Sequence, residues 1–485
     1  MLFNSIDFAV FLPTVFFLYW FAANNDLKSQ NTLLLIASYF FYAWWDWRFL
    51  SLIAFSSLVD FFIGIELSKT DKKRKRLLLL LSSILINIGF LGFFKYFNFF
   101  IKSFVEAFCF IGYPINSGPL NIILPVGISF YTFQTLSYSI DIYKRKVEPT
   151  KDIIAFFAFV SFFPQLVAGP IERATNLLPQ FYKIKTFDYE KAVDGMRQIL
   201  WGLFKKIVIA DNCARYVNTI FTNYTDFSGS TLLLGGVFFA FQIYGDFSGY
   251  SDIAIGTSRL FGFNLKRNFA FPYFSRDIAE FWRRWHISLS TWFRDYIFFP
   301  LGGSYRGIWI NLRNIFIVFV LTGLWHGANW TFVAWGILNA VYFLPLVLIK
   351  KNRRYKQESI ALNSSKEKGR LLPSLLEILQ MGITFFITLI AWVFFRAESI
   401  TDAVNYICGI FSVSIFSLPE IRPRRVIILI MMLVLTEWTQ REKQHALQFN
   451  KAIFPKVVRW GLYYGIILTI LYFGGNKHEF IYFQF

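Results

Sequence analysis

Histidine is the residue type in this sequence best suited to proton transfer, and one of the four histidines lies inside an apolar stretch. His326 occurs in LTGLWHGANWTFVAWG, within the apolar residues 314–349. A neutral imidazole, with an ordinary pKa near ~6.5, can accept a proton from a hydroxyl as that hydroxyl attacks a carbonyl carbon. An ionisable side chain within a membrane segment is costly, which marks it as a functional candidate. His326 is therefore a candidate general base, and transfer of an acyl group to a hydroxyl is a reaction that such a base suits.

A structural role is the alternative for His326. A neutral histidine can hold a helix bundle together through a hydrogen bond to a neighbouring helix. The small residues Gly323, Gly327 and Ala328 flank it closely. They would leave room for a ligand or a closely approaching backbone, and they equally suit tight helix packing.

A second group of chemically suited residues lies in segment 273–303, YFSRDIAEFWRRWHISLSTWFRDYIFFPLGG. Glu280 is four residues from both Arg276 and Arg284, so a helix here would carry ion pairs. One interpretation is a helix at the headgroup level whose arginines reach the interface. The other is a re-entrant element whose cations bind the phosphates of a donor such as coenzyme A. The predicted donor-binding residues are Arg276, Arg283, Arg284 and Arg294, with Lys266 and Arg267 upstream.

Two aspartates, Asp246 and Asp252, lie in the apolar stretch FQIYGDFSGYSDIAIG. They could line a polar cavity or relay protons, but hydrogen bonding between tightly packed helices is the favoured interpretation. His445 lies in a basic stretch typical of a solvated or interfacial face. We assign no role to His445 or to His478.

Several catalytic motifs are missing. The sequence contains no GxxxxGK[ST] phosphate loop, no HExxH metal helix and no GxSxG nucleophile elbow. Thr331 stands five residues after His326, so the HxxxxD arrangement is absent as well. The three cysteines, Cys109, Cys213 and Cys408, are isolated, which indicates neither a disulfide framework nor a zinc site. We therefore expect no metal and no tightly bound cofactor.

The elements that must position these residues are membrane helices. Hydrophobic residues make up 55% of the 485 positions, charged residues only 16%, and the mean hydropathy is +0.46. A soluble chain would carry about a quarter charged residues. The apolar residues occur in long blocks, which need lipid as their solvent. The net charge of +19 does not indicate nucleic-acid binding, because the cations lie mostly in short loops between these blocks.

Apolar blocks long enough to span or re-enter the hydrocarbon predict about 11–13 membrane segments. The block at 230–263 is too long for one simple span, and the block at 314–349 holds two spans. The expected spans are 6–23, 30–46, 49–66, 77–100, 120–140, 152–169, 193–210, 230–263, 314–349, 372–396, 403–418, 426–438 and 457–474.

The basic loops predict the orientation. The densest early cluster of Lys and Arg lies at 69–76, after the third span, and the positive-inside rule places it in the cytoplasm. The N-terminus is then outside, and the same parity puts the basic residues 144–146 inside. The loop at about 350–370, which begins with a basic run, is also predicted to be cytoplasmic. Near the end the rule does not decide, because 422–425 and 441–459 are both basic.

These segments together resemble the membrane-bound O-acyltransferase (MBOAT) family. The resemblance rests on FWRRWHISLSTWFRDYIFFPLGG at 281–303, followed by LTGLWHGANWTFVAWG at 321–336. Within the family the chain is most similar to the bacterial AlgI/DltB-like branch, and nearest to its alginate O-acetylation type. Supporting stretches are LPVGISFYTFQTLSYSIDIY (124–143), FFPQLVAGPIER (162–173), YGDFSGYSDIAIG (244–256) and FIYFQF (480–485).

The resemblance implies an all-α helical membrane fold with re-entrant helices around a central tunnel. His326 matches the family's catalytic histidine, and His286, of the WHISLS motif, lies near the tunnel as a second catalytic candidate. The donor, acetyl-CoA or another acyl thioester, would be reached from the cytoplasmic side. The acyl group would be delivered outside, through a separate extracytoplasmic partner of the SGNH-hydrolase-like type, to a polysaccharide acceptor.

We therefore expect one integral membrane domain over 1–485, with a recognisable core at about 120–345, in the bacterial cytoplasmic membrane. The predicted function is O-acetylation of a cell-surface polysaccharide. Two alternatives involve no covalent step: a glycan or lipid transporter, and a membrane scaffold of a glycan-synthesis complex. Either should retain its function when His326 is lost and the bundle still folds.

Overall fold

The computed structural model describes residues 1–23, 26–113, 115, 118, 120, 122–355, 372–449, 455–474 and 480–481. These residues form helices joined by turns and contain no strand, which confirms the all-α class. Most of the expected loop at 350–370, together with His478 and the last four residues of FIYFQF, lies outside the described residues.

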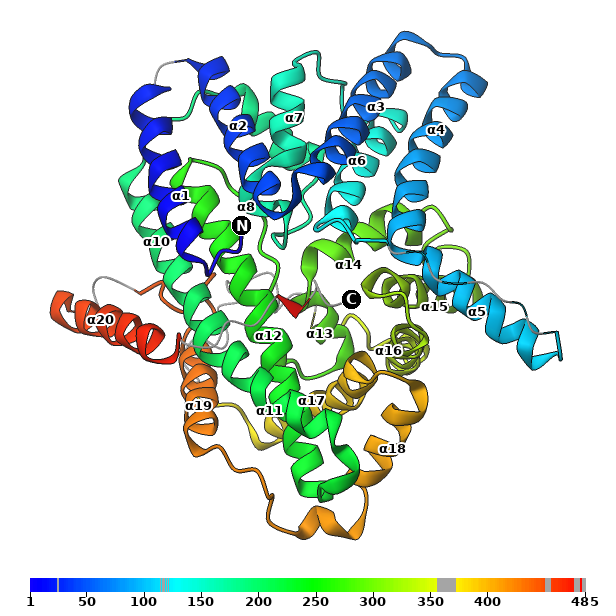
Figure 1. Ribbon diagram of the computed structural model, residues 1–485, viewed down its shortest axis with the longest axis vertical. Helices are drawn as coiled ribbons and strands as arrows, with labels where there is room; N and C mark the ends of the chain where they lie inside the picture. The colour runs from blue at the N-terminus through cyan, green and yellow to red at the C-terminus, as the bar shows by residue number, and fades with distance from the viewer. Residues whose placement is uncertain are drawn as a thin grey trace. The chain divides into compact units, whose positions relative to one another are not determined.

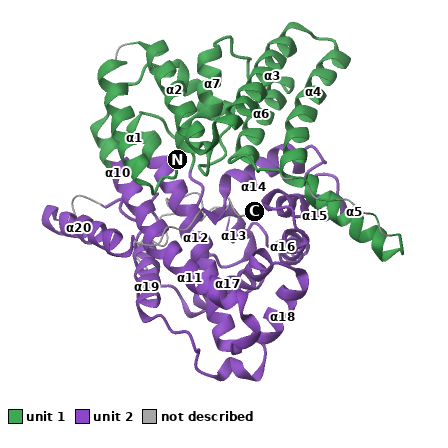
Figure 2. Ribbon diagram, in the orientation of Figure 1, with its two compact units in different colours: residues 1–193, 257–266 green, residues 194–256, 267–485 purple. Residues whose placement is uncertain are grey.

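The chain divides into two compact units, shown in Figure 2. Unit 1 contains residues 1–193 and 257–266, and unit 2 contains residues 194–256 and 267–485. The organisation as one domain with a core at 120–345 stays a prediction. Every residue predicted above to be catalytic belongs to unit 2.

Six helical runs of the described chain are long and apolar enough to cross a membrane, which confirms a multi-pass membrane protein. Two of them, Leu27–Lys69 and Lys73–Phe110, contain two helices each. Two shorter apolar runs accompany them, Ile6–Ala22 and Ile153–Leu166. The other four long runs are Gly229–Leu260, Ile308–His326, Trp330–Leu348 and Leu375–Arg396.

Unit 1 is built from the N-terminal helices (Figure 1). A buried carboxylate, Asp60, lies where three of them meet, and it accepts hydrogen bonds from Ser139 Oγ (2.6 Å) and Asn87 Nδ2 (2.8 Å). Hydroxyl and amide donors thus satisfy a charge-bearing group among apolar helices. The helices are α1 (Ile6–Phe17), α2 (Leu27–Asp46), α3 (Leu50–Lys69), α4 (Lys73–Leu91), α5 (Phe97–Phe110), α6 (Ile128–Tyr143), α7 (Ile153–Ser161), α8 (Phe163–Leu166) and α9 (Ala174–Leu177).

Unit 2 holds the remaining helices, with α10 and α12 each passing from one unit to the other. A π-helix, Phe204–Ala210, joins α10 to α11, and another, Arg294–Phe298, follows α14. The helices are α10 (Tyr189–Leu203), α11 (Asp211–Thr222), α12 (Gly229–Leu260), α13 (Ile278–Arg284), α14 (Ile287–Phe293), α15 (Ile308–His326), α16 (Trp330–Leu348), α17 (Leu375–Arg396), α18 (Ile400–Ile410), α19 (Arg424–Thr439) and α20 (Lys456–Phe473).

The expected spans differ from the observed helices at several places. The block at 230–263 was expected to be too long for one span, but α12 is a single helix of 32 residues. The block at 314–349 does form two helices, α15 and α16, as predicted. The expected span 193–210 changes from α-helix to π-helix at Phe204, because α10 ends at Leu203.

Candidate active site

The pair α15 and α16 positions His326. The two helices lie side by side in Figure 1 and are joined by only three residues after His326. Their close approach depends on glycine, because a Cβ at Gly323 would lie 2.2 Å from the carbonyl oxygen of Phe332. Asn329 caps α16 by accepting a hydrogen bond from Thr331 N (3.1 Å). Gly323 therefore serves close packing, and His326 is held at the end of α15 with only 2% of its surface exposed.

The break between α13 and α14 positions His286. Helix α13 begins at the N-cap Asp277, which accepts from Glu280 N (2.7 Å), and its residue Trp282 donates to Asn339 of α16 (3.2 Å). The chain then turns at His286, whose φ of 43° lies in the left-handed region. Few non-glycine residues adopt this conformation, and such strain gathers at functional sites.

The two imidazoles lie beside each other inside unit 2, with their ring planes inclined at 63°. Their ring centroids are 6.4 Å apart. Trp325 contacts both rings, with centroids 5.8 Å from His286 and 5.1 Å from His326. Phe247 lies 4.6 Å from His286, and Trp335 lies 5.0 Å from His326. The structure therefore brings together, in one aromatic enclosure, the two histidines that stand 40 positions apart in the sequence.

The side chain of His286 is completely buried, and neither ring nitrogen has a hydrogen-bond partner among the described residues. Burial lowers the pKa of His286 to about 3, so the ring is neutral at physiological pH. A buried polar group without a partner is rare in folded proteins and calls for a ligand, a water molecule or a catalytic role.

The arginines of segment 273–303 are engaged in different ways. Glu280 is fully buried and accepts from Arg276 Nη2 (3.1 Å) and Arg284 Nη2 (2.6 Å). Burial raises the pKa of Glu280, but the two guanidinium groups outweigh it and leave the pKa below its ordinary value. The ion pairs predicted from the spacing therefore form. Arg294 is half-exposed and pairs with Asp295 (2.7 Å).

Arg283 differs from the other three arginines. Its Nη1 donates to the carbonyl oxygen of Asn352, just beyond α16 (3.0 Å). Its Nε and Nη2 are buried with no hydrogen-bond partner among the residues that the structure describes. Donor binding by these arginines stays a prediction, and Arg283 retains the most capacity for it.

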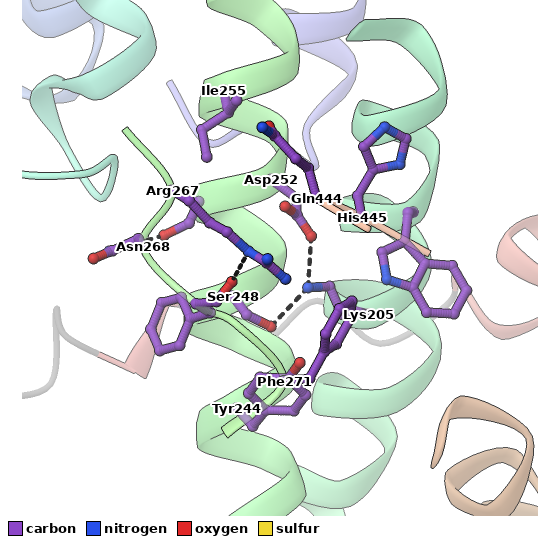
Figure 3. A pocket seen from close by; sticks show the side chains of 13 residues that line it. Lys205, Tyr244, Ser248, Asp252, Ile255, Arg267, Asn268, Phe271, Gln444 and His445 are labelled. Atoms are coloured by element: carbon purple, nitrogen blue, oxygen red, sulfur yellow. Dashed lines mark hydrogen bonds and ion pairs between the residues drawn. The ribbon is translucent and has the colours of Figure 1, made fainter. Parts of the chain in front are cut away.

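A network of buried ion pairs lies elsewhere in unit 2 and was only partly anticipated. Lys205 Nζ binds Asp252 (2.6 Å) and Ser248 (2.8 Å), as Figure 3 shows. The neighbouring Lys206 binds Asp211 (2.7 Å) and Asp246 (2.9 Å). The two aspartates of α12 are thus held by lysines of the preceding π-helix. Adjacent lysines in the apolar segment 193–210 were the signal that could have revealed this network.

A small cavity adjoins this network (Figure 3). Its lining includes Lys205, Asp252, Arg267, Asn268 and His445. The expectation that His445 lies on a solvated or interfacial face is wrong, since it is 1% exposed and its Nε2 lies 3.0 Å from Asp194. The basic residues around it in sequence concealed this burial. Asp252 therefore does line a polar cavity, one of the two interpretations left open.

The arrangement suits acyl transfer to a hydroxyl, and comparison with known proteins gives the same class. The sequence model of MBOAT, the membrane-bound O-acyltransferase family, matches residues 149–386, which include both histidines. The probable alginate O-acetylase AlgI of Pseudomonas aeruginosa is 37% identical over 424 residues, covering 87% of this chain and 77% of that protein. The chain therefore belongs to the MBOAT family, and it is a membrane O-acyltransferase.

Two further relatives have different acceptors in their names. The peptidoglycan O-acetyltransferase of Helicobacter pylori is 35% identical over 439 residues, covering 84% of this chain and 79% of that protein. The teichoic acid D-alanyltransferase of Bacillus subtilis is 30% identical over 252 residues, covering 49% of this chain and 63% of that protein. Of these three relatives, the two named as O-acetyl-transferring proteins align with more of this chain than the D-alanyltransferase does.

Proposed function

We propose that the protein transfers acetyl groups to hydroxyls of a cell-surface polysaccharide, working in the bacterial cytoplasmic membrane. The names of the relatives that cover most of the chain, an alginate O-acetylase and a peptidoglycan O-acetyltransferase, support an acetyl group and a surface polymer. The observation that carries the proposal is the buried pair His286 and His326. Their ring centroids are 6.4 Å apart, and aromatic side chains enclose them.

In the proposed reaction, His326 accepts the proton of the acceptor hydroxyl. The hydroxyl oxygen forms a bond to the carbonyl carbon of the acyl thioester, and the carbon–sulfur bond of the resulting tetrahedral intermediate then breaks. The proton taken by His326 leaves with the thiol. The neutral His286 is suited to donate an N–H hydrogen bond to the developing oxyanion, because its nitrogens have no other partner among the described residues. A donor fixed in a water-poor site stabilises such charge strongly.

The donor proposed is acetyl-CoA, bound from the cytoplasmic side. Two donor nitrogens of Arg283 have no partner among the described residues, and its third nitrogen donates to Asn352, at the start of a loop rich in Lys and Arg. Loops of this composition are cytoplasmic under the positive-inside rule. The same rule, applied to the basic cluster at 69–76, places the N-terminus outside. Guanidinium groups bind phosphate oxygens well, so this end of α16 suits the nucleotide part of the donor.

A separate extracytoplasmic protein, of the SGNH-hydrolase-like type, is proposed to complete the delivery. The segments expected outside the membrane, around 47–48, 101–119 and 397–402, are short. None of them is a domain of a size that could hold a polymer chain by itself. A partner that receives the acyl group, or presents the polymer, would supply that function.

Two measurements test the proposal. O-acetyl esters released by mild alkali from cell-surface polymers should be reduced in cells lacking the protein and restored by the wild-type gene but not by His326→Ala. Purified protein in liposomes, with radiolabelled acetyl-CoA inside and polymer outside, tests the partner. Efficient polymer labelling without any second protein would overturn the relay, while unchanged ester content in deleted cells would overturn the function itself.

A further inference from the structure

Helix α14 begins in an unusual way. Its N-cap residue is His286, whose side chain makes no capping hydrogen bond. The first backbone N–H groups of a helix lack partners within the helix, and the N-cap side chain ordinarily accepts from one of them. Here the imidazole lies against Trp325 and His326 instead. The first amides of α14 therefore need an acceptor from elsewhere in the fold.

Asn268 supplies that acceptor. Its side-chain oxygen accepts from Ser288 N (3.2 Å) and from Ser288 Oγ (2.9 Å), and its backbone carbonyl accepts from Ile287 N (2.9 Å). These are the two amides that immediately follow His286. A residue 18 positions upstream in the chain thus performs the capping that His286 does not.

Asn268 is itself fixed on the other side. It is completely buried, and its side-chain nitrogen donates to Ser251 Oγ of α12 (3.2 Å). A further backbone hydrogen bond, from Ala270 N to the carbonyl oxygen of Arg284 (2.9 Å), joins the same two segments of the chain just before His286. The backbone is therefore secured on both sides of the histidine.

This attachment matters because no polar group of the described residues orients the imidazole itself. Catalytic histidines are usually aligned by a carboxylate or carbonyl on the second ring nitrogen. Neither ring nitrogen of His286 has such a partner among the described residues. The direction of the ring then depends on ring packing and on the left-handed backbone, whose φ of 43° would relax without an external hold.

We propose that Asn268 is a positioning residue for the reaction: by capping α14 in place of His286, it holds the His286 imidazole toward His326. The idea rests on the proposed function only in supposing that His286 takes part in catalysis. The structural half, that Asn268 orients the ring, can be measured without any substrate.

The first test is spectroscopic and uses the fact that the chain has only four histidines. Protein labelled with ¹⁵N in the histidine rings is placed in nanodiscs, and the His286 signals are assigned by their loss in His286→Gln. Asn268→Ala should broaden or split the His286 signals and leave the other three histidines unchanged. Asn268→Asp, which keeps the oxygen acceptor, should restore them at least in part.

Asn314→Ala is the matched control, since Asn314 is also fully buried and holds a loop through the carbonyl of Gly303 (3.1 Å). It should leave the His286 signals as in the wild type. Wild-type His286 signals in Asn268→Ala would overturn the proposal, and so would equal changes at all four histidines, because Asn268 would then act only on general stability.

The second test is kinetic, with acetyl-CoA as the donor and release of its thiol as the readout. Asn268→Ala should lower the turnover about 10–100-fold, as the loss of an orienting contact does, with the KM for acetyl-CoA changed by less than about threefold. Added to His286→Ala, it should cost nothing further, because the two residues act as a unit. Full turnover in His286→Ala would refute the catalytic role of His286, whereas additive losses in the double variant would refute the positioning role of Asn268.

Discussion

Two buried polar regions of unit 2 differ in whether their polar groups have partners. In the lysine network the charges are paired: Lys206 binds both Asp211 and Asp246, and Lys205 binds Asp252. The histidine pair differs, since His286 is completely buried and neither of its nitrogens has a partner among the described residues. Burying an ionisable group is costly in both cases.

The contrast between the lysine network and the histidine pair distinguishes a structural role from a catalytic one. A buried ion pair that satisfies itself holds helices in register, and breaking it leaves an uncompensated charge. A buried imidazole that is left unsatisfied costs stability and is retained where a substrate supplies the missing bond. Substitutions in the network should therefore act on folding, and substitutions at the histidines should act on turnover.

The largest effect is expected at His326. His326→Ala should lower the turnover by about 10²–10⁴-fold, the contribution of a positioned general base, while the yield and thermal stability of the purified protein stay near the wild-type values. Turnover is measured as acetyl ester formed per molecule of folded protein. Retention of more than about a tenth of the wild-type rate would contradict the general-base role.

Lys206 should show the opposite pattern. Lys206→Met leaves two buried carboxylates without their cation, and breaking one buried pair typically costs about 3–5 kcal/mol. The expected result is a marked loss of folded protein and of thermal stability, with turnover per folded molecule unchanged. Lys191→Met is the control, because Lys191 pairs with Asp188 on the surface and should change stability by less than about 1 kcal/mol. Equal losses of stability in the two variants would show that the network has no special structural role.

Arg283 provides a second test of the idea that a buried polar group without a partner among the described residues contacts a ligand; His286 provides the first. Arg283→Gln should raise the KM for acetyl-CoA by about tenfold or more, since a charge-assisted hydrogen bond contributes about 1.5–3 kcal/mol, and should leave the KM for the acceptor unchanged. Arg294→Gln is the comparison, because Arg294 is half-exposed and paired with Asp295. A similar rise in the KM for acceptor and donor, or a similar rise in the two variants, would favour a purely structural role for these arginines.

The sequence predicted the elements better than their contacts. Hydropathy predicted α15 and α16 as a pair, and the spacing predicted the ion pairs of Glu280, because both depend on neighbours in the chain. The single helix α12 was not anticipated, since helix length in a bundle depends on what surrounds it.

The site shows the same limit. His326 and His286 were singled out by motif, but their approach to 6.4 Å and the capping of α14 by Asn268 depend on tertiary contacts. The burial of His445 was hidden by the charged residues beside it, because local composition does not report which face turns inward.

The last prediction concerns the pH dependence of stability, and it isolates His286. Burial lowers the pKa of His286 to about 3, whereas an unfolded histidine has a pKa near ~6.5. Between these values the unfolded chain binds a proton that the folded protein does not, so stability falls as the pH falls from about 6.5 toward 3, by up to about 1.4 kcal/mol per pH unit. His286→Gln removes this group and should flatten the fall, while stability above pH 7 changes little with pH in either protein. Thermal unfolding in detergent at a series of pH values between 7 and 4 measures the difference. Parallel curves of stability against pH for the two proteins would mean that His286 is charged or hydrogen-bonded in the folded state. His286 would then not differ from the paired groups of the lysine network.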